Sequence, residues 1–207
     1  MLTMLLILAS ITFFSMMSPG PDMMLLIRYS SSRSPWPAVA CIAGINCGLS
    51  VHVALAILSI SAVIVASATL YTAAKFAGAA YLVYIGLKSL FADGGMALSN
   101  DPAQPLQRTA AAAFRDGLMC NLLNPKVTIF ILAVFTQVVD PSTAVIDKVI
   151  FGIFIVAESF IVWNLFVRLV RTRLVLGFLQ RHQRAINAVV GVFLVGFGVA
   201  LMLDQNI

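Results

Sequence analysis

The chain has 207 residues, of which 61% are hydrophobic and only 10% are charged. A soluble domain of this length carries about a quarter charged residues, so the composition excludes a soluble fold and indicates a membrane protein. The formal net charge of +5 does not by itself imply nucleic acid, and we expect no nucleic-acid partner.

The apolar segments predict an all-α, polytopic membrane protein with six transmembrane helices, because one span needs roughly 20 apolar residues. A single transmembrane domain then occupies 1–207, and the polar segment 92–113 is its one long connection. A barely polar turn near Ser67 separates the second span from the third. The predicted spans cover about 2–27, 38–65, 70–91, 114–139, 146–167 and 185–203.

The first span is interrupted by the run Ser18-Pro19-Gly20-Pro21-Asp22. A proline removes a backbone donor and clashes with the preceding turn, and a glycine permits dihedral angles that a helix does not use. Backbone freed in this way is tolerated in a bilayer only where protein or a water-filled cavity satisfies it. The alternative is that the span simply ends at this run, although the apolar residues that follow argue against a loop.

The fourth span is interrupted in the same way at Asn124-Pro125-Lys126. Lys126 and Asp22 each lie eleven residues from an arginine at the end of their span. That spacing corresponds to roughly 16 Å of helix, about half of a bilayer core of roughly 30 Å. Charges at this depth mark a pathway or a coupling site, and charged breaks in two helices are typical of transporters. We therefore predict that Asp22 and Lys126 meet, directly or through a substrate.

Small residues recur at helical spacing in the second and third spans. Gly44, Gly48 and His52 follow one another at steps of four, so they share one face of a helix; Gly78 and Gly86 lie in the third span. Small residues at such spacing let a neighbouring helix approach closely. His52 is either a packed, hydrogen-bonded histidine or a coupling residue, and the sequence leaves both alternatives open.

Glu158 in the fifth span lies ten residues from Lys148 and ten from Arg168, which places it near mid-membrane. An isolated acid at that depth is a functional candidate, because a proton carrier has to titrate during the transport cycle. The alternative is a structural carboxyl group that pairs two helices. We predict that Glu158, more than His52, carries a coupling proton.

The positive charges predict the orientation of the chain. Ten Lys and Arg residues flank the odd-numbered connections, whereas only Lys148 flanks the even-numbered ones. By the positive-inside rule the odd-numbered connections face the cytoplasm and both termini face outward. The ten residues are Arg28, Arg33, Lys88, Arg108, Arg115, Arg168, Arg171, Arg173, Arg181 and Arg184.

The two breaks also suggest an internal repeat. Aligning the first break with the second divides the chain into halves of about 1–91 and 114–203, joined by a cytoplasmic linker at 92–113. Each half then holds three spans, so the halves have opposite orientations in the membrane. The sequence therefore predicts a 3+3 inverted repeat whose first and fourth helices are broken.

Four motifs occur in order along the first four spans: Ser-Pro-Gly-Pro-Asp at 18–22, Gly44-x3-Gly48-x3-His52, Lys75-x2-Gly-Ala-x-Tyr81-Leu-x2-Ile-Gly86 and Phe114-x2-Gly-x3-Asn-x2-Asn124-Pro-Lys126. In these motifs the chain resembles the LysE/RhtB superfamily of bacterial amino-acid exporters. The resemblance implies an inner-membrane protein, with periplasmic termini in the orientation above. It also implies export of small neutral amino acids, such as homoserine or threonine, in exchange for protons.

Two other functional classes suit the sequence less well. A membrane redox carrier needs a cysteine pair on facing helices, whereas Cys41, Cys47 and Cys120 form no Cys-x-x-Cys motif. A divalent-cation exporter needs several converging carboxylates or thiolates, and Asp22 and Glu158 are the only acids expected inside the membrane. We expect neither a cofactor nor a resident metal nor enzymatic activity, and a homodimer remains an open alternative.

Overall fold

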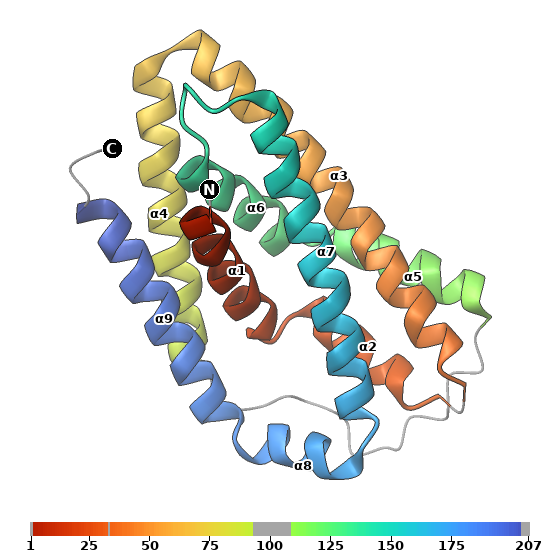
Figure 1. Ribbon diagram of the computed structural model, residues 1–207. Coiled ribbons are helices and arrows are strands. Elements are labelled where there is room, and N and C mark those ends of the chain that lie inside the picture. The colour runs from red at the N-terminus through yellow and green to blue at the C-terminus, as the bar shows by residue number, and fades with distance from the viewer. Residues whose placement is uncertain (1, 33, 93–108, 204–207) are drawn as a thin grey trace.

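The computed structural model describes residues 2–32, 34–92 and 109–203, and these residues form helices joined by short connections (Figure 1). This confirms the predicted all-α fold. Of the predicted linker 92–113, residues 93–108 lie outside the described ranges, as do Arg33 and Arg108. The helices are α1 Leu2–Met17, α2 Pro21–Ser30, α3 Trp36–Ala66, α4 Ala68–Leu90, α5 Ala110–Leu122, α6 Pro125–Val138, α7 Val145–Val170, α8 Arg173–Arg181 and α9 Gln183–Leu203.

Four continuous helices of the described chain, α3, α4, α7 and α9, are long and apolar enough to cross a membrane. Two helix pairs also pass the same test when each pair is taken together: α1 with α2, bent by 67°, and α5 with α6, bent by 59°. Counting each pair as one broken span gives six spans. The polytopic fold and the breaks in the first and fourth spans are thus confirmed.

Local chemistry explains both breaks. Pro21 and Pro125 each occupy the first position of a new helix, where the missing N–H costs nothing and the fixed φ suits the helix. The side chain of Asn124 caps α6 by accepting a hydrogen bond of 3.1 Å from the backbone N–H of Lys126. The chain therefore restarts a helix at each proline instead of continuing the previous one.

One helix was not predicted. The segment between the fifth and sixth spans was interpreted as a polar, arginine-rich connection, whereas residues Arg173–Arg181 form α8. This short helix lies across the end of the bundle, between the ends of α7 and α9 (Figure 1). Its apolar residues Leu176 and Leu179 pack against the core, and Phe178 is exposed.

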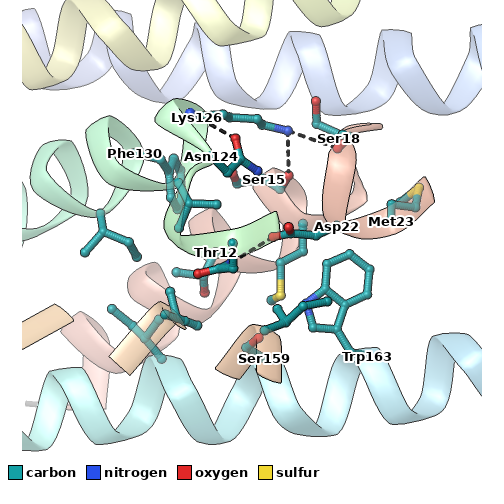
Figure 2. Close-up of a pocket in the computed structure, with 18 residues that line it drawn as sticks. Thr12, Ser15, Ser18, Asp22, Met23, Asn124, Lys126, Phe130, Ser159 and Trp163 are labelled. Atoms are coloured by element: carbon teal, nitrogen blue, oxygen red, sulfur yellow. Dashed lines mark hydrogen bonds between the residues drawn. The ribbon is translucent and has the colours of Figure 1, made fainter. Parts of the chain in front are cut away.

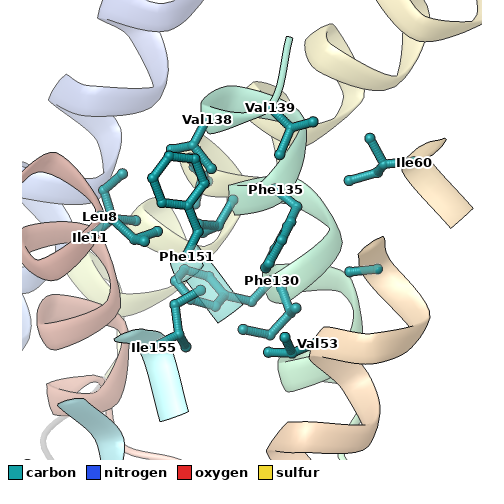
Figure 3. Close-up of a cluster of buried hydrophobic side chains, with 14 of the residues drawn as sticks. Leu8, Ile11, Val53, Ile60, Phe130, Phe135, Val138, Val139, Phe151 and Ile155 are labelled. Atoms are coloured by element: carbon teal, nitrogen blue, oxygen red, sulfur yellow. The ribbon is translucent and has the colours of Figure 1, made fainter. Parts of the chain in front are cut away.

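Two apolar clusters fill the bundle on either side of the breaks. The larger one, drawn in part in Figure 3, joins Leu8 and Ile11 of α1 to the second half of α3, to α6 and to the first half of α7. The smaller one joins α2 to the first half of α3 and the second half of α7, around Tyr29 and Trp163. The broken segments thus lie between two packed layers of side chains.

Glycines allow two helix pairs to approach very closely. A Cβ atom built on Gly44 of α3 would lie 2.0 Å from the backbone oxygen of Phe114 in α5, and one on Gly48 would lie 2.8 Å from Oδ1 of Asn121. Between α4 and α9, a Cβ on Gly86 would lie 2.8 Å from the backbone nitrogen of Val195. No side chain fits at these contacts without displacing backbone or a buried amide.

Gly78, the remaining glycine of the third span, faces α6. A Cβ atom there would lie 2.5 Å from Oγ1 of Thr136 and 3.1 Å from the Cα atom of Ala133. Thus α4 packs closely against both α6 and α9, and the second half of the broken fourth span is held against a continuous helix.

Candidate functional site

A cavity of about 70 Å³ lies where the two broken spans meet; we call it the central cavity. Residues of α1, α2, α3, α5, α6 and α7 line it. Figure 2 shows Lys126 and Ser18 at one edge, Ser159 and Trp163 of α7 at the opposite edge, and Asp22 between them. Most of the wall is apolar, so these few polar groups are the ones that can orient a ligand.

Asp22 lies in the first turn of α2 and is only 8% exposed. Its Oδ2 atom accepts a hydrogen bond of 2.8 Å from Nδ2 of Asn121 in α5. Its Oδ1 atom has no hydrogen-bond partner in the described chain. The N-terminal end of a helix favours a negative charge, so α2 stabilises this carboxylate while leaving one oxygen available to a ligand.

Lys126 reaches across from α6 to the end of α1. Its Nζ atom donates to the backbone oxygen of Ser18 at 3.0 Å and to that of Ser15 at 3.4 Å. These carbonyl groups lie at the C-terminal end of α1, where the helix dipole favours a positive charge. The ammonium group therefore supplies a donor to the Ser18 carbonyl and a second donor to the Ser15 carbonyl, which also accepts from the backbone N–H of Ser18.

Each break is thus held to the other by hydrogen bonds, one set in each direction. The first break supplies the carboxylate that binds Asn121, just before the second break, and the second break supplies the ammonium that binds the end of α1. Among the described residues, no ion pair joins Asp22 directly to Lys126. The structure brings the two predicted charges into one cavity, and a gap remains between them.

His52 lies behind the central cavity rather than in its wall. Its Nε2 atom is 3.1 Å from the backbone oxygen of Asn121, and its Nδ1 atom is 3.4 Å from Oγ1 of Thr128. Both ring nitrogens therefore have partners on the broken fourth span. Asn121 contacts both His52 and Asp22, so a single residue lies between the imidazole and this carboxylate.

Glu158 also lies one residue away from the cavity. Its Oε2 atom accepts a hydrogen bond from Oγ1 of Thr12, and Thr12 is part of the cavity wall. The next residue of α7, Ser159, lines the cavity as well and is buried. The carboxyl group is thus half-buried between α1 and α7, in hydrogen-bond contact with the site.

The other predicted site residues lie at the two breaks. Gly20 and Asn124 line the central cavity. Pro19, Pro21 and Pro125 line a second cavity, on the side of α4 and α9. The predicted residues therefore surround the junction of the breaks, although only some of them face the same space.

Sequence reasoning missed several residues of this site. Asn121 stands in the motif before the second break, three residues from Asn124, but its contact with Asp22 joins residues 99 positions apart. Trp163 is buried in the cavity wall, and nothing in the local sequence distinguishes it from a packing or interface residue. Asn121 lies about one helical turn before Asn124, at the second break. This second asparagine on the same side of the break was the signal that could have identified it.

The donor set does not resemble a metal or redox centre. Within the described ranges, no group of three or more His, Cys, Asp or Glu side chains converges on one point. Cys41, Cys47 and Cys120 are all free thiols. An anion, a cation and backbone carbonyls arranged around a small cavity instead suit a ligand that carries both charges.

Comparison with known proteins supplies a family match. The family described as LysE type translocator matches residues 13–205. The uncharacterized membrane protein YrhP of Bacillus subtilis is 30% identical over 87% of this chain and 90% of its own length. The threonine efflux protein of Escherichia coli K12 is 28% identical over 99% of this chain and 100% of its own length.

A third relative matches over a shorter stretch. The homoserine/homoserine lactone efflux protein of Salmonella typhimurium is 32% identical over 60% of this chain and 59% of its own length. No solved structure matches the chain.

Proposed function

Because this chain belongs to the LysE type translocator family, it is a membrane transporter and not an enzyme, and we propose that it exports small neutral amino acids. The names of two relatives, a threonine efflux protein and a homoserine/homoserine lactone efflux protein, support this substrate class. The bacterial cytoplasmic membrane is the proposed location, with both termini periplasmic as the arginine distribution predicts.

The observation that carries the proposal is the separation of two opposite charges in one cavity. A zwitterionic amino acid can place its ammonium group against the free Oδ1 atom of Asp22 and its carboxylate against Lys126. Each contact is a charge-assisted hydrogen bond, which is stronger than a neutral one. The apolar wall around Met23, Ile45 and Trp163 would then accept a small, uncharged side chain.

We propose further that export is coupled to protons through Glu158. Its hydrogen bond to Thr12 connects the carboxyl group to the cavity wall, so the arrival of substrate can influence protonation and the reverse. In the proposed inverted repeat, the halves 1–91 and 114–203 alternate around the junction of the two breaks. The reciprocal contacts of Asp22 and Lys126 lie in the interface between those halves, beside the close packing of α3 on α5 and of α4 on α9.

Export from vesicles tests the proposal. Everted vesicles containing the protein are given labelled threonine, homoserine, serine, lysine or glutamate, with and without a proton gradient. We expect gradient-dependent accumulation of the neutral amino acids, and loss of at least nine-tenths of it in Asp22→Asn. Asp140→Asn is the matched control, because Asp140 is an exposed acid outside the cavity. Transport of lysine alone, or of a divalent cation instead of amino acids, would contradict the proposal.

A further inference from the structure

A second cavity, of about 560 Å³, lies on the other side of the breaks, where they face α4 and the start of α9; we call it the α4–α9 cavity. It shares Ser18, Gly20, Asn124 and Lys126 with the central cavity. A solute that moves from one cavity to the other therefore passes Lys126. The α4–α9 cavity has the size of a ligand pocket.

Asn187 of α9 is the feature that points to a ligand. It lines the α4–α9 cavity, it is 1% exposed, and neither Nδ2 nor Oδ1 has a hydrogen-bond partner in the described chain. A buried amide without partners is costly, so native proteins rarely leave one unsatisfied without a reason. A group that enters the cavity can satisfy both atoms at once.

The surroundings of Asn187 hold it in place. The hydroxyl group of Ser89 in α4 donates a hydrogen bond of 3.1 Å to the backbone oxygen of Asn187. One turn further along α9, a Cβ atom on Gly191 would lie 2.7 Å from the backbone oxygen of Gly86. The two helices therefore touch beside the cavity, and the backbone of Asn187 is held against α4.

The charge around Asn187 selects a class of ligand. Lys88 lines the same cavity from the exposed end of α4, and Tyr84 adds an exposed hydroxyl group. An amide offers an NH2 group with two donor hydrogens and a carbonyl oxygen that accepts, and these match the carboxylate and the ammonium of an α-amino acid. Lys88 adds a cation for the carboxylate, and its position suits a solute that arrives from the end of the bundle where α8 lies.

We propose that the α4–α9 cavity is a second amino-acid site, occupied by the substrate before it passes Lys126 into the central cavity. The inference rests on the proposed function and adds a position on the transport path. Asn187 binds the zwitterion there, and Lys88 attracts its carboxylate. The site receives substrate from the membrane face on which α8 lies, and not from the opposite face.

The half-saturating threonine concentration, measured separately from each face of the membrane, tests this site. Purified protein is reconstituted in vesicles of neutral lipid and in vesicles with anionic lipid. We expect Asn187→Leu to raise the half-saturating concentration about tenfold from the α8 face only, as the loss of one or two hydrogen bonds requires. The maximal rate stays within about twofold, and Lys88→Gln raises the half-saturating concentration about threefold.

Two matched controls accompany these variants. Asn164→Leu removes an amide from α7 that lines neither cavity, and Arg181→Gln removes an exposed cation from the same end of the bundle. Both should leave the half-saturating concentration unchanged. If Asn187→Leu does not fold, Lys88→Gln decides the question on its own.

An unchanged half-saturating concentration in the folded variants would overturn the inference, as would an equal shift from both faces. An effect that disappears in neutral lipid would also overturn it, because an anionic headgroup would then be the occupant. Each of these results leaves wild-type export intact. A wild-type protein that transports no neutral amino acid would instead overturn the proposed function, and the inference with it.

Discussion

At the scale of single residues, the charges of Asp22 and Lys126 share one cavity without forming an ion pair. We predict that Asp22→Asn and Lys126→Gln each reduce exchange of amino acid at least tenfold, since each leaves the opposite charge uncompensated in a poorly hydrated site. The double variant should lose less than the sum of the two losses. Initial rates of counterflow in vesicles give a coupling energy, which we expect at about 1–3 kcal/mol.

The pair Lys75 and Asp140 provides the matched control for this cycle. Lys75 Nζ lies 3.7 Å from Oδ1 of Asp140, and neither residue lines the central cavity. Neutralising either member, or both, should leave counterflow within about twofold, because neither residue lines the central cavity or the α4–α9 cavity. Additive losses for Asp22 and Lys126 would show that the two residues act independently.

Glu158 and His52 can be distinguished by the kind of transport that each variant loses. We predict that Glu158→Gln keeps counterflow within about threefold but abolishes uphill, pH-driven export, because an amide cannot carry a proton between the two sides of the membrane. Thr12→Val, which removes the hydroxyl group that binds Glu158, should shift the pH profile of export without abolishing it. Export at a series of internal and external pH values measures both effects.

His52→Ala is the comparison for that measurement. The ring of His52 contacts Asn121 and Thr128, so its loss should weaken exchange and driven export alike. Normal pH-driven export in Glu158→Gln, together with its loss in His52→Ala, would transfer the coupling role to His52.

At the scale of helices, the contact of α3 with α5 depends on the absence of side chains. We predict that Gly44→Ala destabilises the folded protein by about 1–3 kcal/mol, since the added Cβ meets the backbone of Phe114, which cannot rotate away. Gly196→Ala is the matched control, because nothing lies within 4 Å of a Cβ atom at that position of α9. Thermal unfolding in detergent should give a lower Tm for the first variant only.

The direction of the change in Tm can also be predicted for the control variant Gly196→Ala. Alanine favours a helix over glycine by up to about 1 kcal/mol, so Gly196→Ala should leave Tm unchanged or raise it slightly. Equal stability of the two variants would mean that α3 and α5 can separate to accommodate a methyl group.

The helices also show how far the sequence alone could lead. Pro21 and Pro125 located both breaks, because the chemistry of proline is local and acts whatever surrounds it. The helix α8 was missed because its arginines, read in order, indicated a polar connection, and only the bundle shows which face of it is covered. The contacts of Asn121 with Asp22 and of Thr12 with Glu158 join distant helices, so no local pattern could predict them.

At the scale of the whole molecule, the connection between α6 and α7 lies at the end of the bundle opposite α8 (Figure 1). We predict that a cysteine at Ser142 is labelled by an impermeant reagent added to intact cells, whereas one at Gln180 is labelled only after permeabilisation. Both positions are exposed, and the positive-inside rule assigns them to opposite sides. The measurement needs a background without Cys41, Cys47 and Cys120.

The reverse labelling pattern would invert the topology and place both termini in the cytoplasm. Labelling of both positions from outside would show that α7, the helix between them, does not cross the bilayer. The six-span arrangement would then be wrong, since α7 is one of its four continuous spans.

Lys126 donates hydrogen bonds to the carbonyl groups of Ser15 and Ser18, and these bonds affect how transport depends on Na⁺ and K⁺. In other transporters with broken helices, exposed carbonyl oxygens of this kind bind Na⁺. Here an ammonium group that belongs to the protein already occupies them, so an alkali cation has to compete with a tethered charge. We expect export to continue at the same rate when choline replaces all Na⁺ and K⁺, and Lys126→Met to gain a response to Na⁺ in its thermal unfolding. Export that is coupled to protons, as proposed, would then proceed at the same rate whatever the Na⁺ concentration on either side of the membrane.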